Sequence, residues 1–197
     1  MEDIILASAS PRRRELLAQI GITHRVAPSL KEEVIQGSCP VEIVQNLARQ
    51  KAEDVALALQ VPGKLVLGAD TVVVFADQIL GKPVEDEDAF RMLKSLQGNT
   101  HQVYTGVAFC VWEKSGRLVT HTFYEETKVE VYSMTEEEIR AYIKTGDCKD
   151  KAGGYGIQGA FGAYIKGIEG DYYNVVGLPI GRVYQELKKF KEKRREV

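Results

Sequence analysis

Cysteine is scarce in this chain of 197 residues, and its spacing supports neither a cross-linked nor a zinc-bound fold. The three cysteines, Cys39, Cys110 and Cys148, are odd in number and lie far apart, and no C-x-x-C pair occurs. Disulfide frameworks and structural zinc sites use paired or closely spaced cysteines. The sequence therefore predicts a protein of a reducing compartment, the cytoplasm.

Long apolar runs and an excess of charge of one sign are also lacking. Runs such as VVVFA are far too short to cross a bilayer. Glu2 and Asp3 precede the first apolar run, whereas a secretory signal begins with basic residues. With 26 basic and 28 acidic residues the net charge is −2, which argues against a protein that coats nucleic acid by bulk electrostatics. We expect a soluble protein that binds neither a membrane nor a nucleic-acid polymer and that holds any anion locally.

Repeats, linkers and shifts in composition do not interrupt the chain. Its hydrophobic content of 44% suits a globular protein, and a chain of this length buries roughly 70% of its unfolded surface. Strand-like and helix-like segments alternate from end to end. The predicted organisation is one α/β domain over residues 1–197, with a single core or two fused lobes.

Helices are predicted by apolar periodicity and by capping residues. They are expected from Pro11 to about Ile20 behind the N-cap Ser10, over Pro40 to Leu59, over Asp86 to Leu96, from Thr135 to about Lys144, and from Pro179 onward. Strands are predicted by alternation and by turn residues. They are expected at residues 3–8, in HRVAPS, in KLVLGADTVVVFAD, in a hairpin at FADQILG, in two long runs around the turn EKSG, and in a hairpin turning at Glu169 and Gly170.

Three consecutive arginines, Arg12, Arg13 and Arg14, stand where the first strand passes into the first helix. Free backbone N–H groups and the helix dipole already make such a junction attract anions, so added cations are unfavourable there unless an anion binds. Adjacent helix positions point in different directions. One or two of the three are therefore expected to face a phosphate, with Ser8 as an extra donor. The alternative is that all three are solvated or paired with carboxylates.

Lys51 falls on the apolar stripe of the second predicted helix, together with Leu47, Ala52 and Val55. An unpaired ammonium group is expensive to bury. Lys51 is therefore expected either to extend to the edge of the core or to meet a negative group. The residue by itself leaves both alternatives open.

Asp70 interrupts the apolar run LVLGADTVVVF, with Thr71 beside it. A carboxylate in a buried strand needs a metal, a cation or backbone N–H donors. A functional role is favoured over a structural one, because ligand sites of open α/β sheets form at strand ends and Gly68 permits close approach. Glu33, in a loop beside Glu32, would complete a site of oxygen ligands for Mg²⁺.

A glycine-rich loop, KDKAGGYGIQGAFG, follows the fourth predicted helix. Gly154, Gly156 and Gly159 match G-x-G-x-x-G literally, but a polar stretch precedes them and the strand-like AFGAYIK follows, which is not the strand and helix of a dinucleotide fingerprint. We expect these glycines to bring backbone close to a ligand, with Gln158 reading a base edge. A flexible loop without function is the alternative. Lys82, in ILGKP, belongs to no Walker A motif, because a proline follows it.

Taken together, these residues suit a nucleoside polyphosphate bound with Mg²⁺. The cations offer charge to phosphates, Glu33 and Asp70 offer ligands to a hard metal, and Gln158 offers an amide to a base. A carboxylate that holds a metal and a water against a phosphoryl group is a common hydrolytic arrangement. The histidines lie singly in strand-like segments and are interpreted as structural.

Several separated motifs resemble, in order and over nearly the whole chain, those of the Maf family of nucleoside triphosphate pyrophosphatases. They are LASASPRRRELL, LARQKA, GADTVV, GKP, DKAGGYGIQG and GDYYNVVGLP. The resemblance implies an elongated α/β fold similar to the inosine triphosphatase superfamily, with a mixed sheet flanked by helices and two lobes around a cleft. It also implies a homodimer that uses a divalent metal cation, Mg²⁺ or Mn²⁺, to cleave between the α and β phosphates.

Carried over by motif, the resemblance also implies a role for each candidate residue. Asp70 would accept the proton of the attacking water, and Glu33 would help Asp70 to hold the metal. The phosphates would be bound by Ser8, Arg12, Arg13, Lys51 and Lys82. Base preference would be set by Arg12, Thr71 and Gln158, in a combination similar to the branch that acts on dTTP and UTP rather than on 7-methyl-GTP. Gly154 stands where many relatives carry alanine.

Two other functions are considered beside hydrolysis. Members of the Maf family are implicated in clearing non-standard nucleotides and in septum-related arrest of division, so a nucleotide-binding regulator without turnover is the main alternative. The basic tail KKFKEKRREV would permit nucleic-acid binding, although its cations also suit the C-terminal end of a helix dipole.

Overall fold

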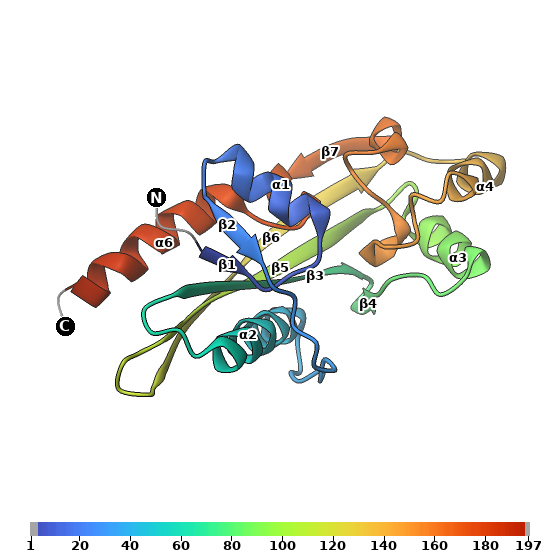
Figure 1. Cartoon of the computed structure of the whole chain (residues 1–197). Coiled ribbons are helices and arrows are strands. Elements are labelled where there is room, and N and C mark those ends of the chain that lie inside the picture. Colours follow the sequence, from blue (N-terminus) through green and yellow to red (C-terminus); the bar gives the residue numbers. More distant parts are fainter. Residues whose placement is uncertain (1–3, 196–197) are drawn as a thin grey trace. The chain divides into compact units, whose positions relative to one another are not determined.

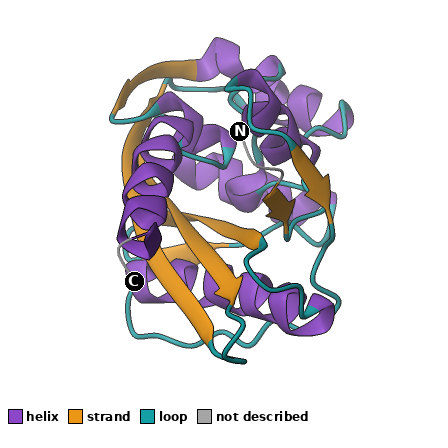
Figure 2. Ribbon diagram, turned by 60° about the vertical axis from the view of Figure 1, so that its left-hand side comes forward, coloured by secondary structure: helices purple, strands orange, loops and turns teal. Residues whose placement is uncertain are grey.

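Strands and helices alternate along residues 4–195, which the computed structural model describes (Figure 1, Figure 2). The strands are β1 (Ile4–Leu6), β2 (His24–Val26), β3 (Leu65–Phe75), β4 (Gln78–Leu80), β5 (Thr100–Trp112), β6 (Leu118–Val131) and β7 (Ile165–Glu169). The helices are α1 (Pro11–Gln19), α2 (Pro40–Leu59), α3 (Asp86–Leu96), α4 (Glu136–Lys144), α5 (Tyr172–Val176) and α6 (Ile180–Arg195), with short 3₁₀ helices η1 (Ala152–Gly154) and η2 (Ala160–Tyr164). Within these residues, every helix is too short or too polar to span a bilayer.

The strands of residues 4–195 form one mixed sheet of seven strands in the order β2-β1-β3-β5-β6-β7, and β4 pairs with β3. β1 is parallel to both β2 and β3, with Leu6 opposite Val26 on one side and Leu67 on the other. β4 runs antiparallel to β3, and β7 runs antiparallel to β6. The predicted class, a mixed α/β fold with helices around the sheet, is confirmed.

The chain divides into two compact units, in agreement with the expected two lobes. Among the described residues, the first unit comprises 4–70, 105–125 and 177–195, and the second comprises Thr71–Tyr104 and Glu126–Val176. Strands β3, β5 and β6 contribute residues to both units.

In the first unit, two glycines bring α2 against the sheet. A Cβ at Gly68 on β3 would lie 2.2 Å from the carbonyl oxygen of Ala48, and a Cβ at Gly106 on β5 would lie 2.2 Å from that of Val44. The small, fully buried Ala48 and Ala52 complete this close contact. The interpretation of Gly68 as room for a ligand is therefore wrong, because the backbone of α2 fills that space.

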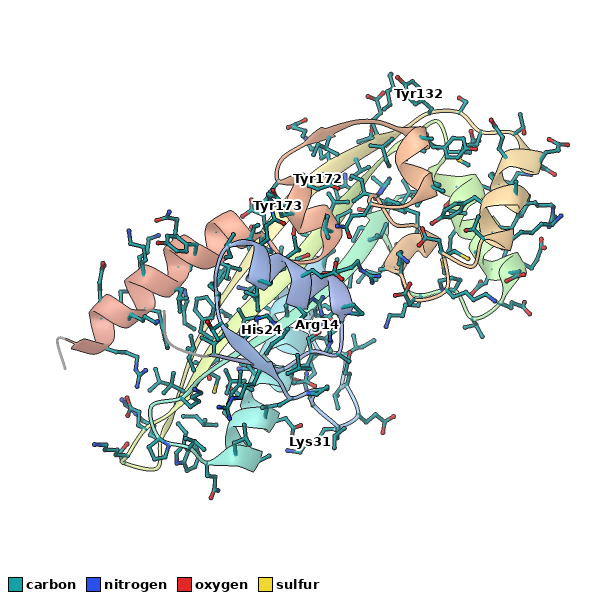
Figure 3. The ribbon with its side chains drawn as sticks, turned by 45° about the horizontal axis from the view of Figure 1, so that its top comes forward. Arg14, His24, Lys31, Tyr132, Tyr172 and Tyr173 are labelled. Carbon is teal, nitrogen blue, oxygen red and sulfur yellow. The ribbon has the colours of Figure 1, made fainter. Side chains whose placement is uncertain are left out.

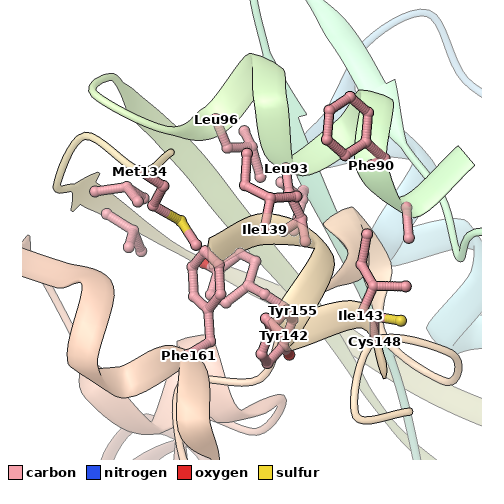
Figure 4. Close-up of a cluster of buried hydrophobic side chains, with 14 of the residues drawn as sticks. Phe90, Leu93, Leu96, Met134, Ile139, Tyr142, Ile143, Cys148, Tyr155 and Phe161 are labelled. Carbon is pink, nitrogen blue, oxygen red and sulfur yellow. The ribbon is translucent and has the colours of Figure 1, made fainter. Parts of the chain in front are cut away.

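The second unit has its own apolar core, packed between α3, α4 and the 3₁₀ helices (Figure 4). Phe161 is fully buried, and its ring centroid lies 4.7 Å from that of Tyr155 and 5.1 Å from that of Tyr142. Leu93 of α3 and Ile139 of α4 belong to the same cluster. This core supports the glycine-rich loop, which supplies Tyr155 and leads into Phe161.

Most helix boundaries agree with the predicted ones, because local residues mark them: prolines in the first turn of α1 and α2, and a capping box at α4. The capping box at Thr135 is formed: its hydroxyl accepts from the backbone N–H of Glu138 at 3.2 Å, and the Glu138 carboxylate accepts from Thr135 N at 2.8 Å. Ser10 occupies the predicted N-cap position of α1, but its hydroxyl makes no capping bond. The α2 helix has the predicted bounds, with Pro40 in its first turn.

Two expectations for the last quarter of the chain are wrong. No hairpin forms at Glu169 and Gly170; β7 ends there and the chain enters α5. The reason is local, since the Asp171 carboxylate accepts from the backbone N–H of Tyr173 at 2.7 Å and so starts a helix. The segment expected to be strand-like also begins with the 3₁₀ helix η2 and becomes a strand only at Ile165.

Replacing Gly68 by alanine is expected to destabilise the first unit. The new Cβ would overlap the α2 backbone, which cannot withdraw without opening the core, so the free energy of unfolding should fall by about 3 kcal/mol. Urea denaturation measures the change. Gly181→Ala is the matched control, because Gly181 is exposed in α6 and a Cβ there would meet nothing within 4 Å, and that variant should be as stable as the parent or slightly more so. Equal stability of Gly68→Ala and the parent would contradict the role given to Gly68.

His101 of β5 gives the second unit a pH-dependent stability. The side chain is fully buried, and its Nε2 lies 2.7 Å from the Tyr155 hydroxyl. Burial lowers the pKa of His101 to about 4, from an ordinary value of about 6.5. The unfolded chain therefore binds this proton more readily than the folded protein, and stability is lost as the pH falls between these two values.

Acidification from about pH 7 to below pH 4 should cost roughly 3 kcal/mol of unfolding free energy through His101 alone. His101→Gln retains a polar partner for Tyr155 but does not titrate, so its stability should fall less over the same range. Urea titrations of both proteins at several pH values between about 4 and 7 measure the two slopes. Identical slopes would show that the acid sensitivity arises elsewhere.

Candidate active site

The junction between β1 and α1 holds Arg13 in place. Ser8 is buried, and its Oγ accepts hydrogen bonds from the backbone N–H of Ser10 at 3.3 Å and from Nη1 of Arg13 at 3.2 Å. Nε of Arg13 donates to the carbonyl oxygen of Gly177 at 2.9 Å, just before α6. The guanidinium group is thus fixed by two segments that lie far apart in the sequence.

The three arginines differ in exposure, in agreement with the expectation that only one or two of them face inward. Arg14 is exposed on α1 (Figure 3), whereas Arg12 and Arg13 are half-buried. Burial lowers the pKa of Arg13, the negative charges of Asp70 and Glu33 raise it, and the charge of Arg12 lowers it. The guanidinium group stays protonated and lies within electrostatic reach of both carboxylates.

Lys51 joins these two carboxylates directly. Its Nζ lies 2.5 Å from Oδ1 of Asp70 on β3 and 3.0 Å from Oε1 of Glu33, which comes from the loop between β2 and α2. The side chains of Lys51 and Asp70 are only 14% and 15% exposed, whereas that of Glu33 is half-exposed. The expectation that Lys51 meets a negative group is confirmed, and Asp70 has the cation that a carboxylate in a buried strand requires.

Two carboxylates around one ammonium group form a donor set that suits a hard divalent cation. Mg²⁺ takes oxygen ligands, and it usually binds one or two carboxylates together with the phosphates of a substrate. Within the described residues, no group of three or more His, Cys, Asp or Glu side chains is arranged to hold a metal. Glu33 and Asp70 therefore fit a metal that binds together with a phosphate chain better than a metal held by protein ligands alone.

The other predicted site residues, Thr71, Lys82 and Gln158, lie in the second unit. Thr71 is half-buried on β3, Lys82 is exposed in the loop after β4, and Gln158 is exposed between η1 and η2. The backbone N–H of Gly153 donates to the carbonyl oxygen of Gly81 at 2.9 Å. This bond brings the loop of Lys82 and the glycine-rich loop together within that unit.

The loop that carries Gln158 is closely packed on charged side chains. Nζ of Lys151 donates to the carbonyl oxygen of Asp147 at 2.6 Å and to its Oδ1 at 2.9 Å. A Cβ at Gly156 would lie 2.5 Å from Cε of Lys151, and a Cβ at Gly159 would lie 2.6 Å from Oδ2 of Asp147. These glycines therefore pack directly on the Lys151 and Asp147 side chains, which disfavours the alternative of a loosely held loop.

The contacts of the histidines agree with the expectation that they are structural. His24 contacts the carbonyl oxygen of Ile22 at 3.0 Å, and His121 pairs with Glu186 of α6 at 3.1 Å. The contact of Arg13 with the carbonyl oxygen of Gly177 was not predicted, because every residue has a backbone carbonyl and the residue type therefore gives no indication of it. Gln50 was also not predicted, although its signal was present as one of a series of polar residues spaced four apart on α2.

Comparison with known proteins places these residues in a wider context. The family model described as "Maf-like protein" matches residues 3–190. A dTTP/UTP pyrophosphatase of Agathobacter rectalis is 55% identical and covers 96% of this chain and 98% of its own length. One from Lachnoclostridium phytofermentans is 48% identical, covering 96% of both chains. Among solved structures, the Ham1 protein of Staphylococcus aureus is similar at a TM-score of 0.43 and 18% identity, over 66% of this chain and 72% of that one.

Replacing Lys51 by methionine should destabilise the first unit by about 2 kcal/mol, because it leaves the half-buried Asp70 and Glu33 without their shared cation. Lys31→Met is the control: Lys31, on the loop beside α2 (Figure 3), pairs with Asp54 at 2.8 Å but is 71% exposed, and an exposed pair contributes less than about 1 kcal/mol. Adding Asp70→Asn to Lys51→Met should restore part of the loss. Thermal or urea unfolding measures all of these variants, and a full additive loss in the double variant would argue against the pairing.

Proposed function

Since the chain belongs to the Maf family of Maf-like proteins, we propose that it hydrolyses dTTP and UTP to the nucleoside monophosphate and pyrophosphate. The family relatives at 48–55% identity bear the name dTTP/UTP pyrophosphatase. The observation that carries the proposal is the meeting of Asp70 and Glu33 at one ammonium group, within electrostatic reach of Arg13. Such a cluster offers a base, metal ligands and phosphate-binding charge in one place.

Asp70 is the proposed base. Its carboxylate, with Oδ1 2.5 Å from Nζ of Lys51, is the proton acceptor closest to the cluster of cations. A water molecule would give its proton to Asp70 while its oxygen bonds to the α phosphorus. The bond from that phosphorus to the oxygen bridging to the β phosphate would break, and pyrophosphate would leave with the bond's electron pair.

The cations are the proposed phosphate ligands. Arg13 presents a guanidinium group that Ser8 and Gly177 already hold in one orientation, so less side-chain entropy is lost when an anion binds. Lys51 would exchange part of its contact with the carboxylates for contact with a phosphate. The full proposed set of phosphate-binding residues is Ser8, Arg12, Arg13, Lys51 and Lys82.

A divalent cation, Mg²⁺ or Mn²⁺, is proposed to act with these residues. When bound, it would polarise the phosphoryl oxygens and offset charge on the leaving pyrophosphate. Glu33 and Asp70 are the carboxylates that would hold it, which agrees with their positions on either side of one ammonium group.

The proposal assigns base preference to Arg12, Thr71 and Gln158. Gln158 presents both donors and an acceptor, from a loop that Asp147 and Lys151 hold by close packing. The cellular role would be removal of unwanted nucleotides from the cytoplasmic pool. A homodimer is proposed with it, on the resemblance to the family alone.

Purified protein incubated with dTTP or UTP and Mg²⁺ should release the monophosphate and pyrophosphate, with dCTP and GTP as comparison substrates. In water labelled with ¹⁸O the label should appear in the monophosphate, because attack is at the α phosphorus. Chromatography and mass spectrometry identify both products. Release of orthophosphate and the diphosphate would reject the cleavage position, and tight binding of dTTP without any product over hours would favour the regulator without turnover.

In the same assay, Asp70→Asn should lower kcat by about 10²-fold or more if the carboxylate is the base. Glu186→Gln is the control, because Glu186 is equally shielded at 15% exposure and also ion-paired, but with Lys189 and His121. That variant should keep the parent kcat. Normal turnover by Asp70→Asn would move the role of base to another residue.

A further inference from the structure

The loop that carries Glu33 is attached to α2 by a series of polar side chains at every fourth position. This α2 polar stripe consists of Glu42, Asn46, Gln50 and Asp54. Residues four apart lie on one face of a helix, and here the whole face bonds to residues 29–38, which run along α2 in the opposite direction. The bonds are Ser29 Oγ and Lys31 Nζ to Asp54, Val34 to Gln50, Asn46 Nδ2 to the Gln36 carbonyl, and Ser38 N and Oγ to Glu42.

Burial of apolar side chains does not fix this loop. Leu30 is 94% exposed, Ile35 is 73% exposed, and Val34 is exposed as well. The free energy that orders residues 29–38 must therefore come from the polar bonds to α2 and from the ion pair of Glu33 with Lys51. Glu33 itself is half-exposed, so its position depends on how firmly the backbone on either side is held.

Gln50 makes two of these bonds, and they are the ones nearest to Glu33. Its Oε1 accepts from the backbone N–H of Val34 at 3.0 Å, and its Nε2 donates to the carbonyl oxygen of Val34 at 2.7 Å. The N–H belongs to the peptide unit that joins Glu33 to Val34, so this pair of bonds orients the backbone directly at Glu33. Lys51 is the next residue of α2, and its Nζ lies 3.0 Å from Oε1 of Glu33.

We infer that Gln50 is a positioning residue of the active site, which sets the Glu33 carboxylate beside Lys51 and Asp70 for binding of the metal–nucleotide. The inference rests on the proposed function and adds to it a residue that acts only through Glu33. Glutamine suits this task because its amide supplies one acceptor and one donor, as a neighbouring strand would do. Without these bonds the loop would sample many arrangements, and Glu33 would be in place for only a fraction of the time.

A double-variant cycle tests the action through Glu33. Gln50→Met, which keeps the length of the side chain and removes both bonds, should lower kcat/KM for dTTP about tenfold at low Mg²⁺ and raise the half-saturating Mg²⁺ concentration by a similar factor. Gln50→Glu keeps only the acceptor and should fall between Gln50→Met and the parent. In the Glu33→Gln background, Gln50→Met should cost almost nothing more. Additive losses, or parent activity in Gln50→Met, would overturn the inference.

Asn46→Ala is the matched control, because Asn46 belongs to the same stripe and bonds to the same loop, but at Gln36. It should change kcat/KM and the Mg²⁺ dependence less than twofold, since the two bonds at Val34 remain. A loss equal to that of Gln50→Met would mean that the attachment of the loop as a whole matters, and would overturn the assignment to Gln50. Thermal unfolding of each variant shows that the first unit is intact.

Two measurements without turnover separate this inference from the proposed function. Amide hydrogen exchange at Val34 should be at least about tenfold faster in Gln50→Met than in the parent or in Asn46→Ala. Mn²⁺ binding in the presence of a non-hydrolysable dUTP analogue, followed by electron paramagnetic resonance, should weaken in Gln50→Met and not in Asn46→Ala. If the parent releases no pyrophosphate, the proposed function fails, and these measurements still decide whether Gln50 positions Glu33; unchanged exchange and unchanged Mn²⁺ binding would show that it does not.

Discussion

The first unit depends on the contact of one ammonium group, that of Lys51, with the carboxylates of Asp70 and Glu33. Asp70 lies on a strand most of whose residues are buried, where an ionised group without a partner is costly. Lys51 lies on the inward face of α2, where the same cost applies. The burial of each charged group is tolerated because the other neutralises it, so Lys51 and Asp70 must lie close together for either to be buried.

That closeness comes from residues that carry no charge. Gly68 and Gly106 remove the two Cβ atoms that would otherwise separate α2 from the sheet. α2 can then lie close enough to the sheet for the ammonium group of Lys51 to contact Asp70. On the adjoining face of α2, the polar stripe holds residues 29–38 and so brings in Glu33. One helix therefore positions a cation on one face and a loop on the next.

Local signals in the sequence were enough to predict the regular elements and the special nature of Lys51 and Asp70. The bounds of α2 follow from a first-turn proline and from apolar residues that recur at helical spacing along its 20 residues. The start of α4 follows from its capping box. Long-range contacts could not be predicted in this way. Periodicity left open whether Lys51 extends to the edge of the core or meets a negative group, and it did not identify Asp70 or Glu33 as that group. The hairpin expected at Gly170 failed because one side-chain bond from Asp171 favours a helix, a competition too fine for pattern reasoning. The role of Gly68 was predicted wrongly, because a strand needs glycine both where a ligand approaches closely and where a helix does. The sequence does not distinguish the two cases.

The arrangement also constrains how a triphosphate would bind. Lys51 balances two carboxylates, and it cannot remain fully on both while it contacts a phosphate chain. As Lys51 turns toward the phosphates, Asp70 and Glu33 lose part of their counter-charge and come to face further negative groups, which is unfavourable unless another cation joins them. Arg13 adds no new positive charge, because its guanidinium group already interacts electrostatically with both carboxylates before the nucleotide binds. In the proposal, a divalent cation that enters with the nucleotide would restore the balance, and metal and triphosphate would then bind together rather than in separate steps.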